Sequence, residues 1–206
     1  MSLLSEIAAE IRVCTLCELS QSRTNAVPGA GPEDAEVFFI GEAPGRNEDQ
    51  QGLPFVGASG EFLTKLIRRA GCERSEVFIT NVVKCRPPGN RDPMPDEIAA
   101  CAPYLDRQIA AIDPLVIVTL GRFSMARYFP NERISRIHGR PKKVGRRTVV
   151  PMYHPAAALH QNALRSVIEE DFDQLGKIIA RARAERDKEA AADEDAPSSH
   201  EQMKLF

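Results

Sequence analysis

The sequence predicts a single-domain α/β protein in which a central, mostly parallel sheet of four strands lies between two layers of helices. Short apolar runs alternate along the chain with longer segments of helical periodicity, which is the order of β-α-β units. Each run is almost continuously apolar, as in strands that are buried on both faces. With 206 residues, the chain is also long enough to form one domain with a substantial core.

Each element has its own sequence signal. The expected strands are short apolar runs bounded by Gly or polar residues: 36–40, 77–83, 115–120 and 148–153. The expected helices have apolar residues at helical spacing: 5–13, 61–70, 95–112 and 164 to about 185. Gly71 marks the end of the second helix. Pro95 stands in the first turn of the third helix, where its missing N–H costs nothing.

Residues 184–206 differ in composition from the rest of the chain. They hold seven acidic and three basic side chains, whereas residues 1–183 carry a small excess of basic ones. Bulky apolar side chains are absent from this segment until Met203, so it cannot bury enough surface to fold. We therefore expect a folded domain at 1–183 and a disordered acidic tail at 184–206.

The sequence favours a cytoplasmic monomer that does not enter membranes. No apolar run approaches the roughly 20 residues that span a bilayer, and the opening segment lacks the basic and apolar regions of a signal peptide. Thiols stay reduced in the cytoplasm, so cysteines there bind metals more readily than they form disulfides.

Four cysteines are spaced as candidate metal ligands. Cys14 and Cys17 form a C-x-x-C pair, and Cys85 and Cys101 follow far downstream. Four thiolates suit either a zinc ion or an iron–sulfur cluster, which would tie the N-terminal arm to the middle of the chain. The alternative is unrelated buried cysteines, because Cys packs readily as a small apolar residue. Cys72, next to a predicted helix end, is expected to be a packed or free thiol.

Polar side chains follow three of the expected strands. Glu42 and Glu48 come after the first strand, Asn81 lies at the end of the second, and His154 follows the fourth. Ligands of open parallel sheets bind beyond the carboxyl ends of the strands, so these groups are expected to share one cleft. Taken singly, each has a simpler role: a surface carboxylate, a strand-end cap or a structural His, with Phe55 in the core.

Four motifs together resemble the family 4 uracil-DNA glycosylases, the iron–sulfur members of their superfamily. They are GEAPGRNED from Gly41, PFVG from Pro54, TNVVKCRPPGNR from Thr80 and MYHPAAAL from Met152. The resemblance extends from about Cys14 to the last helix. It implies a uracil-DNA glycosylase-like fold, a 4Fe–4S cluster on the four cysteines and removal of uracil from DNA as the first step of base-excision repair. Zinc on the same thiolates remains the alternative.

The resemblance also implies roles for the residues of the cleft. Phe55 would stack on a flipped uracil, and the Asn81 amide would read its O4 and N3–H edge. His154 would donate a hydrogen bond to uracil O2, where negative charge develops. Glu42 or Glu48 would stabilise the cationic sugar or orient water. The resemblance also places Gly41 and Ala43 in the uracil-binding pocket.

Two departures from the best-known family of the superfamily affect catalysis and specificity. That family has an Asp two residues after the motif's first Gly and a Tyr after its Pro, where this chain has Ala43 and Gly45. The water-activating Asp is therefore missing, and a glutamate is expected to replace it. Glu48 is also the candidate for crowding the methyl group of thymine.

Other residues are expected to contact the DNA. Leu159, or Ala158 beside it, would fill the gap that the flipped base leaves. Basic residues from Arg86 to Arg91 and along 136–147 would contact phosphates, foremost Arg86, Arg136 and Arg140, although a basic run is more often a solvated loop. A relative that captures uracil covalently uses a His between Asn81 and the last cysteine, and this chain has none there, so turnover is expected.

The chain ends in a short peptide that resembles the Gln-x-x-Leu-Phe motif of bacterial sliding-clamp ligands. Leu205 and Phe206 would fill an apolar pocket of the clamp, Gln202 would bond at its rim, and the acidic linker would act as a leash. Two other functions fit parts of the sequence: a broader deaminated-base glycosylase that also acts on hypoxanthine, and a non-catalytic iron–sulfur DNA-binding module.

Overall fold

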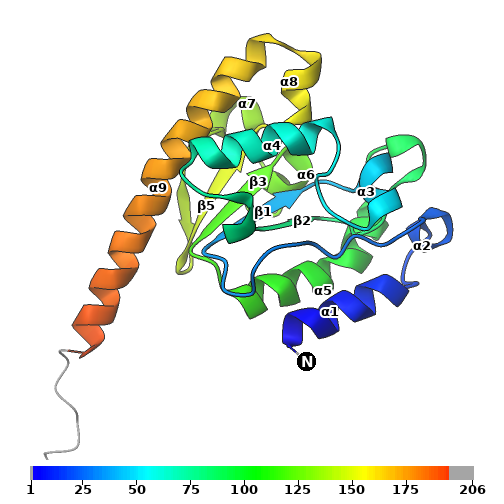
Figure 1. Ribbon diagram of the computed structural model, residues 1–206, viewed down its shortest axis with the longest axis horizontal. Helices are drawn as coiled ribbons and strands as arrows, with labels where there is room; N and C mark the ends of the chain where they lie inside the picture. The colour runs from blue at the N-terminus through cyan, green and yellow to red at the C-terminus, as the bar shows by residue number, and fades with distance from the viewer. Residues whose placement is uncertain (1, 195–206) are drawn as a thin grey trace, which may run out of the picture.

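The computed structural model describes residues 2–194 and shows one α/β domain built on a single five-stranded sheet in this part of the chain (Figure 1). The strand order is β2-β1-β3-β5-β4. β1 pairs in parallel with β2 and β3, and β3 pairs in parallel with β5. The strands are β1 (Val37–Gly41), β2 (Phe78–Asn81), β3 (Val116–Leu120), β4 (Lys142–Val144) and β5 (Arg147–Met152).

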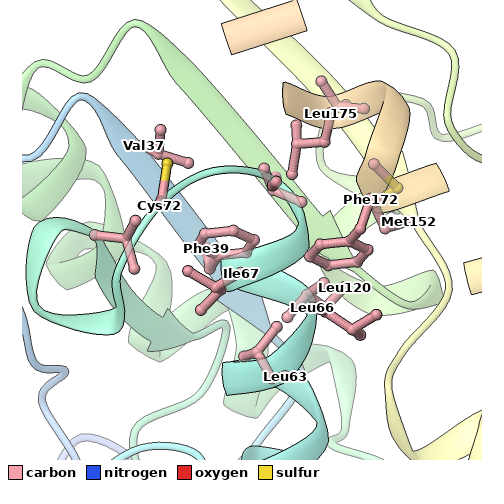
Figure 2. Close-up of a cluster of buried hydrophobic side chains, with 14 of the residues drawn as sticks. Val37, Phe39, Leu63, Leu66, Ile67, Cys72, Leu120, Met152, Phe172 and Leu175 are labelled. Carbon is pink, nitrogen blue, oxygen red and sulfur yellow. The ribbon is translucent and has the colours of Figure 1, made fainter. Parts of the chain in front are cut away.

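Helices cover both faces of this sheet, which confirms the three-layer prediction. Neighbouring side chains of β1 point to opposite faces: Phe39 packs with Leu66 and Phe172 in one core, which Figure 2 shows, and Phe38 belongs to the other. The longer α-helices are α1 (Leu3–Val13), α4 (Ala58–Arg69), α5 (Pro95–Ile112) and α9 (Ala163–Glu194). The shorter ones are α2 (Leu19–Ser22), α3 (Arg46–Gln51), α6 (Arg122–Ala126), α7 (Ile134–Ile137) and α8 (Ala156–His160), with 3-10 turns at Arg74–Glu76 and Pro88–Asn90.

The sheet has one strand more than the four that the sequence predicts. β4 pairs antiparallel with β5 at the edge of the sheet, and the two form a hairpin that turns at Gly145, where φ is +60°. All three β4 residues are exposed. A short, charged edge strand has no buried face, so it lacks the alternation that predicts strands and resists pairing with other chains.

The last helix is longer than expected. The prediction that the chain is disordered from residue 184 is wrong for residues 184–194, because α9 continues through them to Glu194. This stretch holds four Ala and three Glu, which favour helix. The side chains of Arg183 and Arg186 both pair with Glu36 ahead of β1. Of the helices formed by residues 2–194, none combines the length and apolar character needed to cross a bilayer.

Candidate active site

The loops that follow β1, β2 and β5 enclose a pocket at the carboxyl edge of the sheet. Its volume is about 890 Å³, including the space at its open mouth. The sequence-predicted residues that line it together are Glu42, Ala43, Glu48, Phe55, Asn81 and His154. The sequence interpretation gave no role to six other lining residues. Pro44, Pro87, Asn90 and Ala156 lie within the quoted motifs, whereas Ser59 and His160 lie outside them.

Asn81 lies at the floor of this pocket. It ends β2 in register with Gly41 of β1 and is 2% exposed. A Cβ on Gly41 would stand 2.3 Å from Asn81 Oδ1 and 2.7 Å from Phe55 Cζ, so only glycine lets these side chains approach each other. Within the described residues Asn81 Oδ1 accepts no hydrogen bond. A buried acceptor without a partner costs stability, and a bound ligand that donates to it would remove this cost.

Phe55 is held in an unusual backbone conformation, with φ at +52°. Its carbonyl oxygen packs against Gly60 of α4, where an added Cβ would stand only 1.9 Å away. The Phe55 ring stacks on the His154 ring, with centroids 5.6 Å apart and an angle of 27° between the planes. Strain of this kind in a non-glycine residue is typical of functional sites, where surrounding contacts hold it in place.

His154 is fixed as a neutral imidazole. Its Nδ1 accepts a hydrogen bond of 3.1 Å from the backbone N–H of Ala156, so the ring proton of the neutral form resides on Nε2. Burial lowers the pKa of His154 to about 4, against a weaker opposing effect of the Glu48 carboxylate. At neutral pH the side chain is therefore an uncharged hydrogen-bond donor.

The two glutamates have different surroundings. Glu48 Oε1 accepts hydrogen bonds from the backbone N–H groups of Val56 (2.9 Å) and Gly57 (3.0 Å), and its Oε2 accepts one from Gly45 (3.1 Å). The Glu48 carboxylate thus holds together the loop that carries Phe55. Glu42 makes no side-chain hydrogen bond to any described residue. Burial raises the pKa of Glu42, as does the Asp92 carboxylate, while Arg122 opposes the shift.

The four candidate ligand cysteines surround a second, smaller cavity. Cys14, Cys17, Cys85 and Cys101 all line it, together with apolar side chains from α1 and the loop after β2. Arg23 Nη1 donates a hydrogen bond of 3.1 Å to Cys85 Sγ. Among residues 2–194, no three His, Cys, Asp or Glu side chains converge closely enough to hold a single metal ion. Cys72 is buried in the hydrophobic core, as a packed thiol.

Comparison with known proteins assigns the chain to one family. The model of the uracil DNA glycosylase superfamily matches residues 28–176. A type-4 uracil-DNA glycosylase of Sulfurisphaera tokodaii is 51% identical over 188 residues, which is 86% of each chain. The chain belongs to the type-4 uracil-DNA glycosylases. Relatives with the same name in Archaeoglobus fulgidus and Thermotoga maritima are 47% and 42% identical, over 88% and 86% of this chain and 96% of each relative.

Two of the predicted DNA-facing residues, Leu159 and Arg86, lie at the pocket of this type-4 uracil-DNA glycosylase. Leu159 is 47% exposed on α8, between pocket-lining residues of the same helix. Arg86 donates a hydrogen bond of 2.6 Å to Asn90 Oδ1 at the mouth of the pocket. Arg136 and Arg140 are exposed on the segment that leads into β4, with no ion pair to any described residue.

Three other side chains of the basic run form ion pairs. Arg146 and Arg147 both pair with Asp113, which precedes β3 and therefore lies at the opposite edge of the sheet. Lys143 pairs with Glu185 of α9 at 2.7 Å. The expectation that the whole run from 136 to 147 contacts phosphates is therefore wrong for these three side chains. The clamp-motif residues Gln202, Leu205 and Phe206 lie outside the described residues.

Proposed function

We propose that this chain is a monofunctional uracil-DNA glycosylase that flips uracil out of DNA and hydrolyses its N-glycosidic bond. The observation that carries the proposal is the convergence of Phe55, Asn81 and His154 on one pocket, where the buried oxygen of Asn81 has no partner among the described residues. Enzymes that act on a base must extract it from the stack into such a pocket.

The Asn81 amide supplies selectivity for uracil. Its oxygen accepts from uracil N3–H, and its NH₂ group donates to uracil O4. Cytosine presents an acceptor at N3 and an amino group at C4, which leaves both ends of a buried amide unpaired. Discrimination through unpaired buried polar groups is far stronger than discrimination by an apolar contact.

His154 stabilises the departing base. As the bond between sugar C1′ and uracil N1 breaks, its electron pair leaves on uracil and positive charge develops on the sugar. The Nε2–H of neutral His154 donates to uracil O2 and stabilises this anion without transferring a proton. A water molecule then attacks C1′, and loss of its proton gives the abasic sugar.

We assign the carboxylate function beside the sugar to Glu42 rather than Glu48. The Glu48 oxygens already accept three backbone hydrogen bonds, which supports a role in holding Phe55 and Gly45 in place. Glu42 lines the same pocket and makes no side-chain hydrogen bond to a described residue. Its carboxylate can stabilise the cationic sugar or accept a proton from the attacking water.

The four cysteines fit a 4Fe–4S cluster. Each iron of such a cluster takes one thiolate, so its ligands stand farther apart than the four ligands of one zinc ion. The cysteines line one cavity without converging on a single metal position, and Arg23 donates to one of the sulfurs. When bound, the cluster would cross-link the N-terminal arm, the loop after β2 and α5, which makes its role structural.

Two further assignments extend the proposal. Leu159 fills the gap in the base stack, and Arg86, Arg136 and Arg140 contact phosphates, which gives binding without sequence preference and a strong dependence on salt. The terminal peptide with Gln202, Leu205 and Phe206 tethers the enzyme to the bacterial sliding clamp. The enzyme acts as a cytoplasmic monomer.

Single-turnover cleavage of an oligonucleotide with one uracil tests the proposal, with abasic sites revealed by alkali. Asn81→Ala and His154→Ala should each lower the rate by roughly 100-fold or more, the size of loss seen when one preorganised donor is removed. Exposed Asn131 offers the matched control, and Asn131→Ala should cleave like the parent. Unchanged rates in both pocket variants would contradict the assignment.

A further inference from the structure

Lys84 is a fully buried lysine that the proposed chemistry does not use. It follows β2, three residues after Asn81 and directly before Cys85, and is 1% exposed. Lysine is almost never buried unless its ammonium group is paired or fully hydrogen-bonded. A Met side chain would fill a similar volume without that cost of desolvation. Burial lowers the pKa of Lys84 to about 7, but the three partners of its Nζ are all hydrogen-bond acceptors, which favours the protonated form. A lysine here therefore calls for an explanation beyond packing.

All three donors of the Lys84 ammonium group are engaged. Its Nζ donates to the backbone carbonyl of Asn81 (2.8 Å), to Thr80 Oγ1 (2.6 Å) and to Gln108 Oε1 (2.8 Å). Gln108 Nε2 and the Thr80 hydroxyl each donate a further 2.8 Å bond to the carbonyl of Pro28. The network thus joins the end of β2 to α5 and to the segment ahead of β1. A fully satisfied buried network of this kind is rigid.

The orientation of the Asn81 amide depends on its backbone. Its Oδ1 has no hydrogen-bond partner among the described residues, so no bond to that oxygen fixes the side chain before a base arrives. The absence of a side chain at Gly41 leaves room for the Asn81 amide but gives it no hydrogen bond. Asn81 is the last residue of β2, and the hydrogen bond from Lys84 Nζ to its backbone carbonyl connects it to the buried network.

We propose that Lys84 is a positioning residue for uracil recognition: its ammonium group fixes the backbone of Asn81 and thereby aims the amide at the base. This inference rests on the proposed role of Asn81 as the reader of uracil. Lys84 is not among the residues that line the base pocket and borders the cysteine cavity instead, so it acts on the base only through Asn81.

A double-mutant cycle tests the inference. Lys84→Met should lower the single-turnover rate on uracil DNA by roughly 10- to 100-fold, the loss that accompanies a positioning error of about 1 Å. In an Asn81→Ala background the same substitution should have almost no further effect, because the group that Lys84 aims is already gone. DNA affinity, measured with an uncleavable 2′-fluorinated deoxyuridine substrate, should change far less than the rate. Exposed Lys65 provides the control variant Lys65→Met, which should match the parent.

The outcomes separate this inference from the proposed function. If Lys84→Met costs the same factor in both backgrounds, its effect is general and the positioning role is refuted. If Asn81→Ala itself leaves the rate unchanged, the proposed function fails instead. Thr80→Val, which removes one Lys84 acceptor and keeps the lysine, serves as the second variant if Lys84→Met does not fold. Its smaller rate loss should likewise vanish in the Asn81→Ala background, and an additive loss would overturn the inference.

Discussion

His154 should stay neutral when the pH is lowered well below 6.5, where an ordinary histidine takes up its proton. Burial lowers the pKa of His154 from 6.5 to about 4. At pH 5.5, about 3% of such a side chain is protonated, compared with about 90% of an unperturbed one. The shift corresponds to about 3 kcal/mol of unfolding free energy. The unfolded chain binds this proton between pH 6.5 and 4 and the folded chain does not, so stability falls as the pH is lowered through that window.

An NMR titration of the imidazole signals measures this directly. The His154 resonance is assigned as the one missing from His154→Gln, and its midpoint should lie near pH 4. The kinetic counterpart uses the Glu42→Gln background, because burial raises the pKa of that carboxyl and its titration would otherwise contribute. There the rate should not fall between pH 6.5 and about 5; above this window Lys84, whose pKa burial lowers to about 7, also titrates. A midpoint near 6.5, or a rate that falls through that pH, would refute the neutral-donor mechanism.

Four further predictions concern single features of the chain. Gly41→Ala should leave the protein folded by circular dichroism but lower the cleavage rate by roughly 100-fold, since its Cβ would collide with Asn81 Oδ1; full activity would contradict the pocket geometry. Glu48→Gln should lower the unfolding free energy by about 2 kcal/mol in denaturant titrations, because a neutral amide accepts its backbone bonds less well. Cys101→Ala should lose iron and visible absorbance and melt at a lower temperature, and zinc in place of iron in the parent protein would disprove the cluster. Deletion of residues 202–206 should abolish binding to a bacterial sliding clamp in surface plasmon resonance and leave oligonucleotide cleavage intact, whereas retained clamp binding would disprove the tether.

The sequence predicts the four parallel strands because each is an apolar run with both faces buried, such as Val116–Leu120. β4 gives no such signal, since its exposed residues owe their strand conformation to pairing with β5. Helices of four to six residues, such as α3 and α8, are too short for helical periodicity to identify them. The composition of the segment 184–194 fits both a solvated helix and a disordered tail, so the sequence alone does not identify the end of α9.

Much of the site follows from strand order alone, because the carboxyl ends of parallel strands meet at one edge and bring Glu42, Asn81 and His154 together. The roles of the glutamates could not be separated in this way. Glu48 is distinguished from Glu42 by backbone N–H groups eight and nine residues downstream, whose positions depend on the folded loop. The burial of Lys84 is likewise invisible in the sequence, where a lysine beside a cysteine looks like a surface residue.

Base selectivity is the most direct test of the account. Hypoxanthine and thymine present the same C=O and N–H edge to the Asn81 amide as uracil, so only a pocket shaped for uracil rejects them. Three duplexes are prepared that carry uracil, hypoxanthine or thymine opposite guanine. Each is incubated with anaerobically purified protein and then treated with alkali. The account predicts cleavage only at uracil, lost in Asn81→Ala and retained in Asn131→Ala. Comparable cleavage at hypoxanthine, or no cleavage of any duplex by protein that holds its cluster, would contradict it.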